Sequence, residues 1–220
     1  MDPGKTGHIN SIQVIFTIGI IAGIETGIYH LPFEPLVRTG IARCIEIAFL
    51  LWLFKASDTG LAVIGLSKEL LLPGFKKGLI WSAGFGLLAF LAGAVLFFAG
   101  INPFKLFNAG LPGTRTDLVL FYIIGGLIAP VAEEIFFRGV IYGYVKGLLK
   151  KTLLQWSIPI AVIISTAFFV TAHQGGAGIA LPQLVGGIVF CLSYEMEKSL
   201  VTPMVIHSAG NLALFTISFL

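Results

Sequence analysis

Six polar residues in otherwise apolar stretches have side chains of the types that peptide-bond hydrolysis requires. They form three groups along the chain: Glu133, Glu134 and Arg138; then His173; then His207 and Asn211. Hydrolysis needs an activated water, a proton for the leaving amine and donors for the developing oxyanion. A carboxylate and an imidazole can activate the water, and side-chain N–H groups can stabilise the oxyanion. The three groups together therefore suggest a protease site.

Helical spacing predicts which of these side chains meet. Glu134 and Arg138 are four residues apart, share a helix face and can form an ion pair. Glu133 is turned by about 100° from Glu134, so the two carboxylates can face different surroundings. His207 and Asn211 are also four apart and would present two donors on one face. Three helices would thus each turn one polar face to a common interior.

The composition of the chain indicates where these helices lie. The sequence has 220 residues, of which 56% are hydrophobic and 11% charged, with a net charge of +3. A soluble domain carries about 25% charged residues, so this chain has too few to cover a globular surface. The sequence predicts an integral membrane protein. It argues against a disordered chain, a disulfide scaffold, a coiled coil and a nucleic-acid-binding domain.

The predicted fold is all-α, a polytopic transmembrane helical bundle of about seven spans. A span needs about 20 mostly apolar residues. The candidates are 12–32, 38–55, 78–100, 117–145, 156–178, 180–196 and 200–220. We expect one integral membrane domain over 1–220, with N-terminal spans at about 12–100 and the motif-bearing core at about 117–220. A polar stretch between Lys55 and Lys77 could form a short helix on the membrane surface.

The basic residues between the spans predict the orientation. Nine lysines fall on one side of a seven-span arrangement: Lys5, Lys55, Lys68, Lys76, Lys77, Lys146, Lys150, Lys151 and Lys198. The other side holds Arg38, Lys105 and Arg115. Short loops rich in Lys and Arg stay in the cytoplasm, which predicts a cytoplasmic N-terminus and an external C-terminus.

Depth in the membrane is the least favourable part of the geometry. From the span midpoints and a rise of about 1.5 Å per residue, Glu133 and His173 lie roughly 12–14 Å apart along the membrane normal. Pro130, just before the two glutamates, removes a backbone donor. It predicts a kink and a free carbonyl near the site.

The motif residues resemble those of the CAAX-processing and bacteriocin-processing family of glutamic-type intramembrane proteases. The family pattern is EExxxR, FxxxH and HxxxN on successive transmembrane helices. The matching residues here are Glu133-Glu134…Arg138, Phe169…His173 and His207…Asn211. The resemblance covers about 120–215, whereas the first hundred residues match only as hydrophobic spans.

The resemblance implies a role for each motif residue. Glu133 would activate water with the help of His173, and His207 with Asn211 would stabilise the oxyanion. Glu134 and Arg138 would form a supporting ion pair. It also implies cleavage near the C-terminus of a membrane-associated substrate, such as a sorting signal, a bacteriocin or a lipidated tail. We expect no cofactor, no metal and no nucleic-acid partner. A short chain is typical of prokaryotic members, which predicts a cell (inner) membrane location.

Two other functions fit some of the same residues. A zinc-dependent membrane peptidase could use Glu133, His173 and His207 as ligands, although the chain has no HExxH motif. A non-enzymatic immunity or transport protein could also hold carboxylates and histidines inside the membrane, either as an ion pathway or as a network that fixes helix packing.

A second, smaller group of charged residues consists of Glu25, Arg43 and Glu46. Arg43 and Glu46 are three apart and can pair on one helix face, which favours a structural role. The alternative is that the Arg43 guanidinium receives the C-terminal carboxylate of a substrate.

Overall fold

The structure is a computed structural model, which describes residues 9–103, 109–173 and 181–219. Within these residues it is helical throughout, which confirms the all-α class. The long helices are α1 (Ser11–Tyr29), α2 (Pro35–Ala56), α3 (Lys68–Phe98), α7 (Ser157–Ala172), α8 (Leu181–Glu197) and α9 (Val201–Ile217). A seventh runs without a break over 115–149 in five segments.

These helices correspond to the seven predicted spans. Four described segments are long and apolar enough to cross a membrane: Ser11–Tyr29, Leu61–Phe98, Arg115–Leu149 and Leu154–Ala172. Helix α9 is apolar but shorter. Part of the fifth predicted span and the start of the sixth lie outside the described residues. The chain is therefore an integral membrane protein with about seven helical spans.

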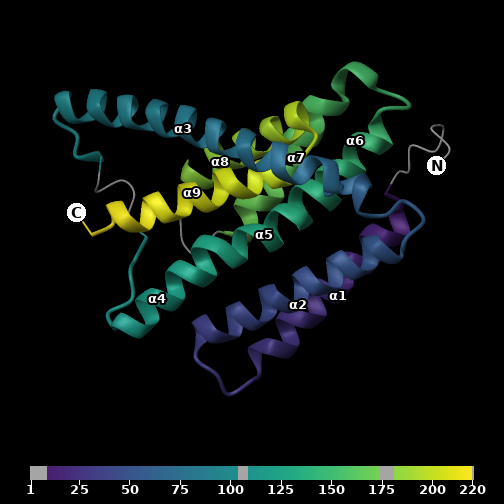
Figure 1. Cartoon of the computed structure of the whole chain (residues 1–220), viewed down its shortest axis with the longest axis horizontal. Coiled ribbons are helices and arrows are strands. Elements are labelled where there is room, and N and C mark those ends of the chain that lie inside the picture. The colour runs from purple at the N-terminus through teal and green to yellow at the C-terminus, as the bar shows by residue number, and fades with distance from the viewer. Residues whose placement is uncertain (1–8, 104–108, 174–180, 220) are drawn as a thin grey trace.

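The third span starts earlier than the sequence suggested. Helix α3 begins at Lys68 instead of residue 78, and the short 3-10 turn η1 (Leu61–Ile64) precedes it. Residues 68–77 of the polar stretch are thus the first part of α3, and residues 57–67 form the turn that contains η1, so the stretch is not a separate surface helix. Packing explains the extension: α3 lies along α9 (Figure 1), and a Cβ at Gly74 would approach Ser199 Oγ to 2.1 Å.

The motif-bearing helix contains two π-helical segments. The segments α4 (Arg115–Ile123), α5 (Ala129–Glu134) and α6 (Gly143–Leu149) are α-helical. The segments between them, η3 (Ile124–Ile128) and η4 (Ile135–Tyr142), are π-helical. Such π segments are rare in helices and occur often at functional sites.

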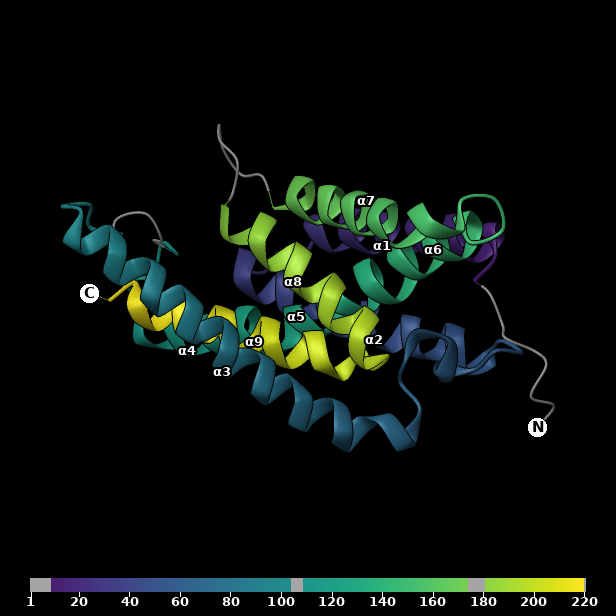
Figure 2. The same cartoon turned by 90° about the horizontal axis from the view of Figure 1, so that it is seen from above.

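The other helices surround this long helix. The α1–α2 hairpin lies on one side, where α2 packs against α5 and η3. Helices α7 and α8 lie side by side, as Figure 2 shows, and both pack against η4. A buried apolar core, including Leu50, Phe54, Val140 and Leu200, joins α2, η4 and the start of α9.

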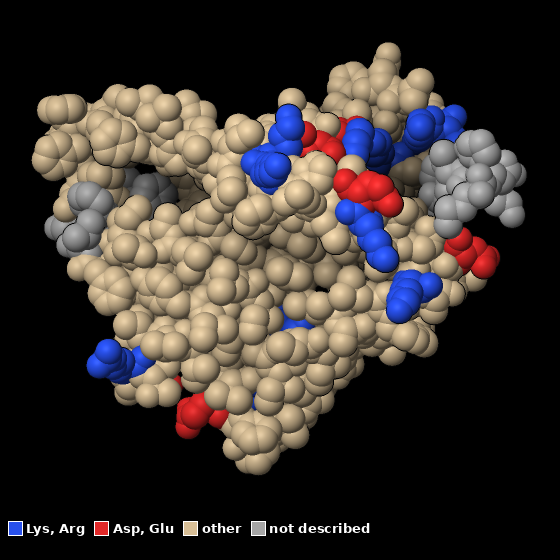
Figure 3. Space-filling model, in the orientation of Figure 1, with Lys and Arg blue, Asp and Glu red and all other residues tan. Residues whose placement is uncertain are grey.

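Charged side chains gather at one end of the bundle. Figure 3 shows Lys and Arg concentrated near α6, while most of the visible face is uncharged. At this end Lys77 Nζ lies 3.7 Å from Glu197, and Lys146, Lys150 and Lys198 line one pocket. Of the basic residues used to predict the orientation, Lys5 and Lys105 lie outside the described residues.

Candidate active site

The predicted pair of Glu134 and Arg138 is an ion pair sealed inside the protein. Arg138 Nη1 donates to Glu134 Oε1 at 2.9 Å, and both side chains are 0% exposed. The same carboxylate oxygen accepts a second hydrogen bond, from His207 Nδ1 at 2.8 Å. The ion pair therefore also fixes the ring of a histidine on another helix, α9.

Glu133 faces two imidazole rings. Its Oε2 atom is 3.3 Å from His173 Nε2 and 3.8 Å from His207 Nε2. Unlike that of Glu134, the side chain of Glu133 is partly exposed, at 15%, although its Oε2 atom is buried; the His173 side chain is 28% exposed. The turn of about 100° between successive helical residues separates the two carboxylates, as the sequence predicts.

The hydrogen bonds at Nδ1 orient both imidazoles. His173 Nδ1 lies 2.8 Å from the Phe169 carbonyl, and His207 Nδ1 lies 2.8 Å from Glu134. A carbonyl or carboxylate oxygen accepts, so each Nδ1 carries the hydrogen, and each Nε2 is left to face Glu133. If the imidazole is neutral, its Nε2 atom turns a lone pair toward the carboxylate. This arrangement is suited to a proton shared by Glu133 and His173, or to a water molecule that contacts both side chains.

The position of His173 differs from the depth calculated from the sequence. The rise-based estimate separates Glu133 and His173 by roughly 12–14 Å because it gives all spans a common midplane. Helix α7 instead packs against η4 and α6, the second half of the long helix. Running antiparallel from Ser157, it brings its C-terminal end level with Glu133. His173 follows that helix directly, and its ring reaches the carboxylate.

Asn211 bonds to the backbone of the motif helix. Its Nδ2 donates to the Gly125 carbonyl at 2.8 Å. Around η3 the helix uses a five-residue register, in which the Ala129 N–H donates to Ile124. The next donor in this register would be Pro130, which has no N–H, so the Gly125 carbonyl needs a partner from elsewhere. One N–H of Asn211 is thus engaged, and its second remains for other contacts.

Two parts of the site, both from α8, were not identified from the sequence, and the contact of a third residue, Phe169, was not foreseen. The Phe190 ring stacks on His207, with centroids 4.6 Å apart, and lies 5.0 Å from the Arg138 guanidinium. The Gly187 carbonyl accepts from Arg138 Nη2 at 3.3 Å. Phe169, noted only as a motif residue, lies 4.5 Å from the same guanidinium. A phenylalanine and a glycine in an apolar run give no signal of such contacts.

The second group of charged residues forms its own network on α1 and α2. Arg43 donates to both Glu25 and Glu46, so the predicted pair is joined by a third member. Glu46 is 2% exposed, while Arg43 and Glu25 are 23% and 45% exposed. An electrostatic interaction links Arg43 to Glu133, because α2 packs against α5.

The described part of the chain contains no group of three or more His, Cys, Asp or Glu side chains placed to hold a metal ion. Glu133, His173 and His207, the ligands that a zinc peptidase would use, therefore do not form such a group.

Comparison with known proteins gives a match over the motif-bearing half. Residues 115–213 match the family model described as Type II CAAX prenyl endopeptidase Rce1-like. The Membrane-embedded CAAX protease MroQ of Staphylococcus aureus (strain USA300) is 33% identical over 98 residues, which are 44% of this chain and 38% of MroQ. The UPF0177 protein YxdF of Lactococcus lactis subsp. lactis (strain IL1403) is 30% identical over 91 residues, which are 41% of this chain and 45% of YxdF.

Each of these matches thus spans less than half of the relative concerned. No solved structure shows significant similarity to the chain. The matched region begins with α4 and ends within α9, and it contains all six motif residues.

Proposed function

We propose that this chain is an intramembrane endopeptidase of the glutamic type and a member of the CAAX-processing and bacteriocin-processing family, and the match of residues 115–213 to the Rce1-like family model supports this proposal. The observation that carries the proposal is the convergence of two imidazole Nε2 atoms on Glu133 Oε2, at 3.3 and 3.8 Å. The Glu133 side chain is 15% exposed, whereas the neighbouring ion pair of Glu134 and Arg138 is fully buried.

In the proposed reaction, Glu133 and His173 hold a water molecule. Glu133 takes one proton from this water while the water oxygen forms a bond to the scissile carbonyl carbon. The carbon–nitrogen bond then breaks, and the proton passes from Glu133 to the leaving amine. The products are a carboxylic acid, which keeps the second proton of the water, and an amine. That proton then passes from the acid to the amine, which gives a carboxylate and an ammonium group, and the two side chains return to their starting states.

The oxyanion formed in this reaction needs donors, and His207 and Asn211 are the proposed ones. His207 already uses its Nδ1–H at Glu134, so it can donate from Nε2 only when doubly protonated. Asn211 can offer the N–H that Gly125 does not use. Glu134 and Arg138 are positioning residues in this mechanism, since they hold the ring of His207.

We further propose that the substrate is a membrane-associated protein or peptide cut near its C-terminus, such as a sorting signal, a bacteriocin or a lipidated tail. The proposed location is a prokaryotic inner membrane, with the lysine-rich end of the bundle and the N-terminus in the cytoplasm. An impermeant thiol reagent should label K151C in spheroplasts only after the membrane is permeabilised, and should label R115C before that.

The test compares protein termini by mass spectrometry in host membranes that carry the wild type, Glu133→Gln or Glu25→Gln. Glu133→Gln preserves size but removes the base, and we expect wild-type-dependent termini to fall by about a hundredfold or more. Glu25→Gln makes the same chemical change in the α1–α2 network and should leave these termini in place.

Three results would count against the proposal. Identical termini in all membranes, with the Glu133→Gln protein folded and inserted, would favour a binding or transport protein. Full activity of Glu133→Gln would remove this residue from the chemistry. Loss of activity with a chelator, restored by zinc, would favour the zinc peptidase instead.

A further inference from the structure

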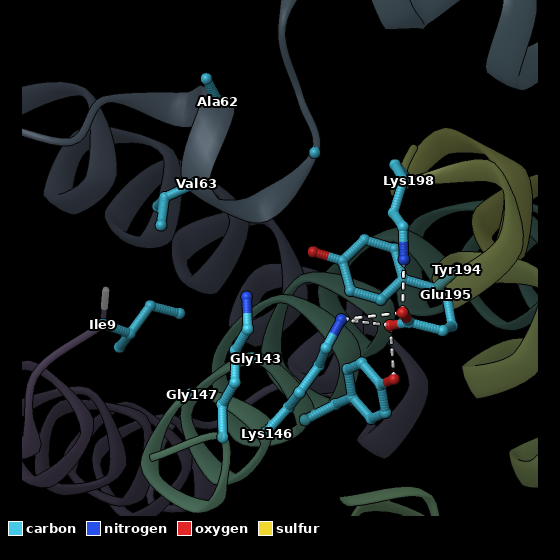
Figure 4. Close-up of a pocket in the computed structure, with 12 residues that line it drawn as sticks. Ile9, Ala62, Val63, Gly143, Lys146, Gly147, Tyr194, Glu195 and Lys198 are labelled. Carbon is cyan, nitrogen blue, oxygen red and sulfur yellow. Dashed lines mark hydrogen bonds and ion pairs between the residues drawn. The ribbon is translucent and has the colours of Figure 1, made fainter. Parts of the chain in front are cut away.

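A pocket lies at the lysine-rich end of the bundle, away from the motif residues. Its cavity volume is about 290 Å³. Figure 4 shows that the lining comes from segments far apart in sequence: the start of the chain, the η1 turn, the η4–α6 junction and the end of α8. The mechanism proposed above uses none of its lining residues.

The side chains in this pocket carry an excess of positive charge. Lys146, Lys150 and Lys198 line it with a single carboxylate, Glu195, which leaves a net charge of +2. Glu195 binds the Lys146 ammonium at 2.6 and 2.8 Å and also accepts from Lys198 and from the Tyr142 hydroxyl. Glu195 therefore holds two ammonium groups and a hydroxyl around one point (Figure 4).

Lys150 is the cation that this network does not use. Among the described residues its ammonium has no ion-pair or hydrogen-bond partner, yet it lines the same cavity. A lysine ammonium offers three donors and attracts an anion as a compact point charge. The pocket thus combines one unpaired cation with two cations that are already positioned.

The wall opposite α6 is held in an unusual backbone conformation. Lys198 has a φ of +54°, which is uncommon for a residue other than glycine. Gly65 packs against it: a Cβ at Gly65 would lie 2.8 Å from the Lys198 carbonyl, and the Gly65 carbonyl accepts from Leu200 N–H at 3.1 Å. Backbone strain of this kind persists where the surrounding contacts impose it, and it is concentrated at functional sites.

Neighbouring apolar side chains place this end at the membrane boundary. Just after Lys150 the chain exposes Leu153, Leu154 and Trp156, at 45%, 67% and 55%. Tryptophan beside lysines is typical of the zone where the headgroups lie. Basic pockets between transmembrane helices on the cytoplasmic side bind anionic headgroups.

We propose that this pocket binds a phosphate group, presented at the membrane surface by the headgroup of an anionic phospholipid. The phosphate lies between Lys150 and the ammonium groups held by Glu195. This site is independent of the proposed protease activity. Its chemistry fits a free phosphate ion as well, and the experiment separates these two sources.

The experiment measures the unfolding temperature of the full chain in neutral detergent. The probes are short-chain phosphatidylglycerol, diacylglycerol with the same acyl chains, and inorganic phosphate. We expect phosphatidylglycerol to raise the unfolding temperature in a saturable way and diacylglycerol to have little effect, since a ligand stabilises the state that binds it. Inorganic phosphate acting at equal concentrations would make free phosphate the ligand, while a much weaker effect assigns the site to the lipid.

Lys150 and Lys151 provide a matched pair of variants, because both are exposed and only Lys150 lines the pocket. Lys150→Gln should weaken phosphatidylglycerol binding about fivefold or more, the loss expected for one lysine near an anionic surface. Lys151→Gln should leave it unchanged. Equal losses in the two variants would overturn the proposal, and so would equal stabilisation by phosphatidylglycerol and diacylglycerol.

Discussion

The two charged clusters inside the bundle differ in how they arrange their carboxylates. The α1–α2 cluster places one cation, Arg43, between Glu25 and Glu46 on consecutive helices. The motif cluster draws on α5, η4, α7 and α9, and it separates a sealed pair from an accessible one. Among the described residues, Glu46 Oε1 in the first cluster and both Glu133 Oε2 and Glu134 Oε2 in the second are buried without a hydrogen-bond partner.

Glu46 Oε1 and Glu133 Oε2 differ in their surroundings. Glu133 Oε2 lies beside the Nε2 atoms of two imidazoles on a side chain that is 15% exposed. Glu46 Oε1 is on a side chain that is 2% exposed, and the charged neighbours of Glu46 are Arg43 and Glu25. A buried charge alone therefore does not indicate catalysis. What distinguishes the motif cluster is a partner that can exchange a proton, the imidazole ring.

The largest expected effect, on the free energy of unfolding, comes from breaking the buried ion pair of Glu134 and Arg138. Arg138→Met leaves the Glu134 carboxylate buried with only His207 as a partner, and we expect a loss of about 3–5 kcal/mol in the free energy of unfolding. Reversible denaturation in mixed micelles would measure it. The double variant Glu134→Gln, Arg138→Met should recover part of the loss. A loss below about 1 kcal/mol would show that water or lipid headgroups reach the pair.

The next effect tests whether an imidazole is what separates the clusters. His173→Gln removes the group that holds water with Glu133, so kcat on the identified substrate should fall about a hundredfold or more. His30→Gln, an exposed change in the turn after α1, is the control and should keep full activity. A normal kcat in His173→Gln would show that Glu133 does not need His173 to activate the water, against the proposed mechanism.

Asn211 provides a test of the distorted helix on which the motif cluster lies. Asn211→Ala leaves the Gly125 carbonyl without a partner, at an expected cost of about 1–3 kcal/mol in unfolding free energy. Adding Pro130→Ala supplies an N–H for the same carbonyl, so the double variant should lose less than the sum of the two single variants. Strictly additive losses would contradict the role assigned here to Pro130.

Sequence reasoning gave the helices and the six motif residues because both depend on local patterns. Apolar runs define spans, and spacing by four puts Glu134 and Arg138 on one face. The missing parts depend on contacts between helices. The level at which α7 packs brings His173 to Glu133, the register of η3 turns Asn211 to Gly125, and α8 supplies Phe190. Rise along separate helices does not determine any of these contacts.

The smallest expected effect concerns the contact between the two clusters. Arg43 interacts electrostatically with Glu133 but forms its hydrogen bonds with Glu25 and Glu46. Arg43→Gln should therefore change kcat by no more than about threefold, as a charge acting at a distance and not as a contact with the substrate. Arg43→Lys should restore the wild-type rate, because it restores the charge.

A larger loss of kcat in Arg43→Gln would contradict the distinction drawn here between the two charged clusters. If Arg43→Gln lowered kcat as much as His173→Gln, with KM raised and no rescue by Arg43→Lys, the planar guanidinium itself would be required. Arg43 would then bind the substrate, as a carboxylate at its C-terminus would allow. The α1–α2 cluster would in that case be part of the active site, with Glu25 and Glu46 holding the arginine in position.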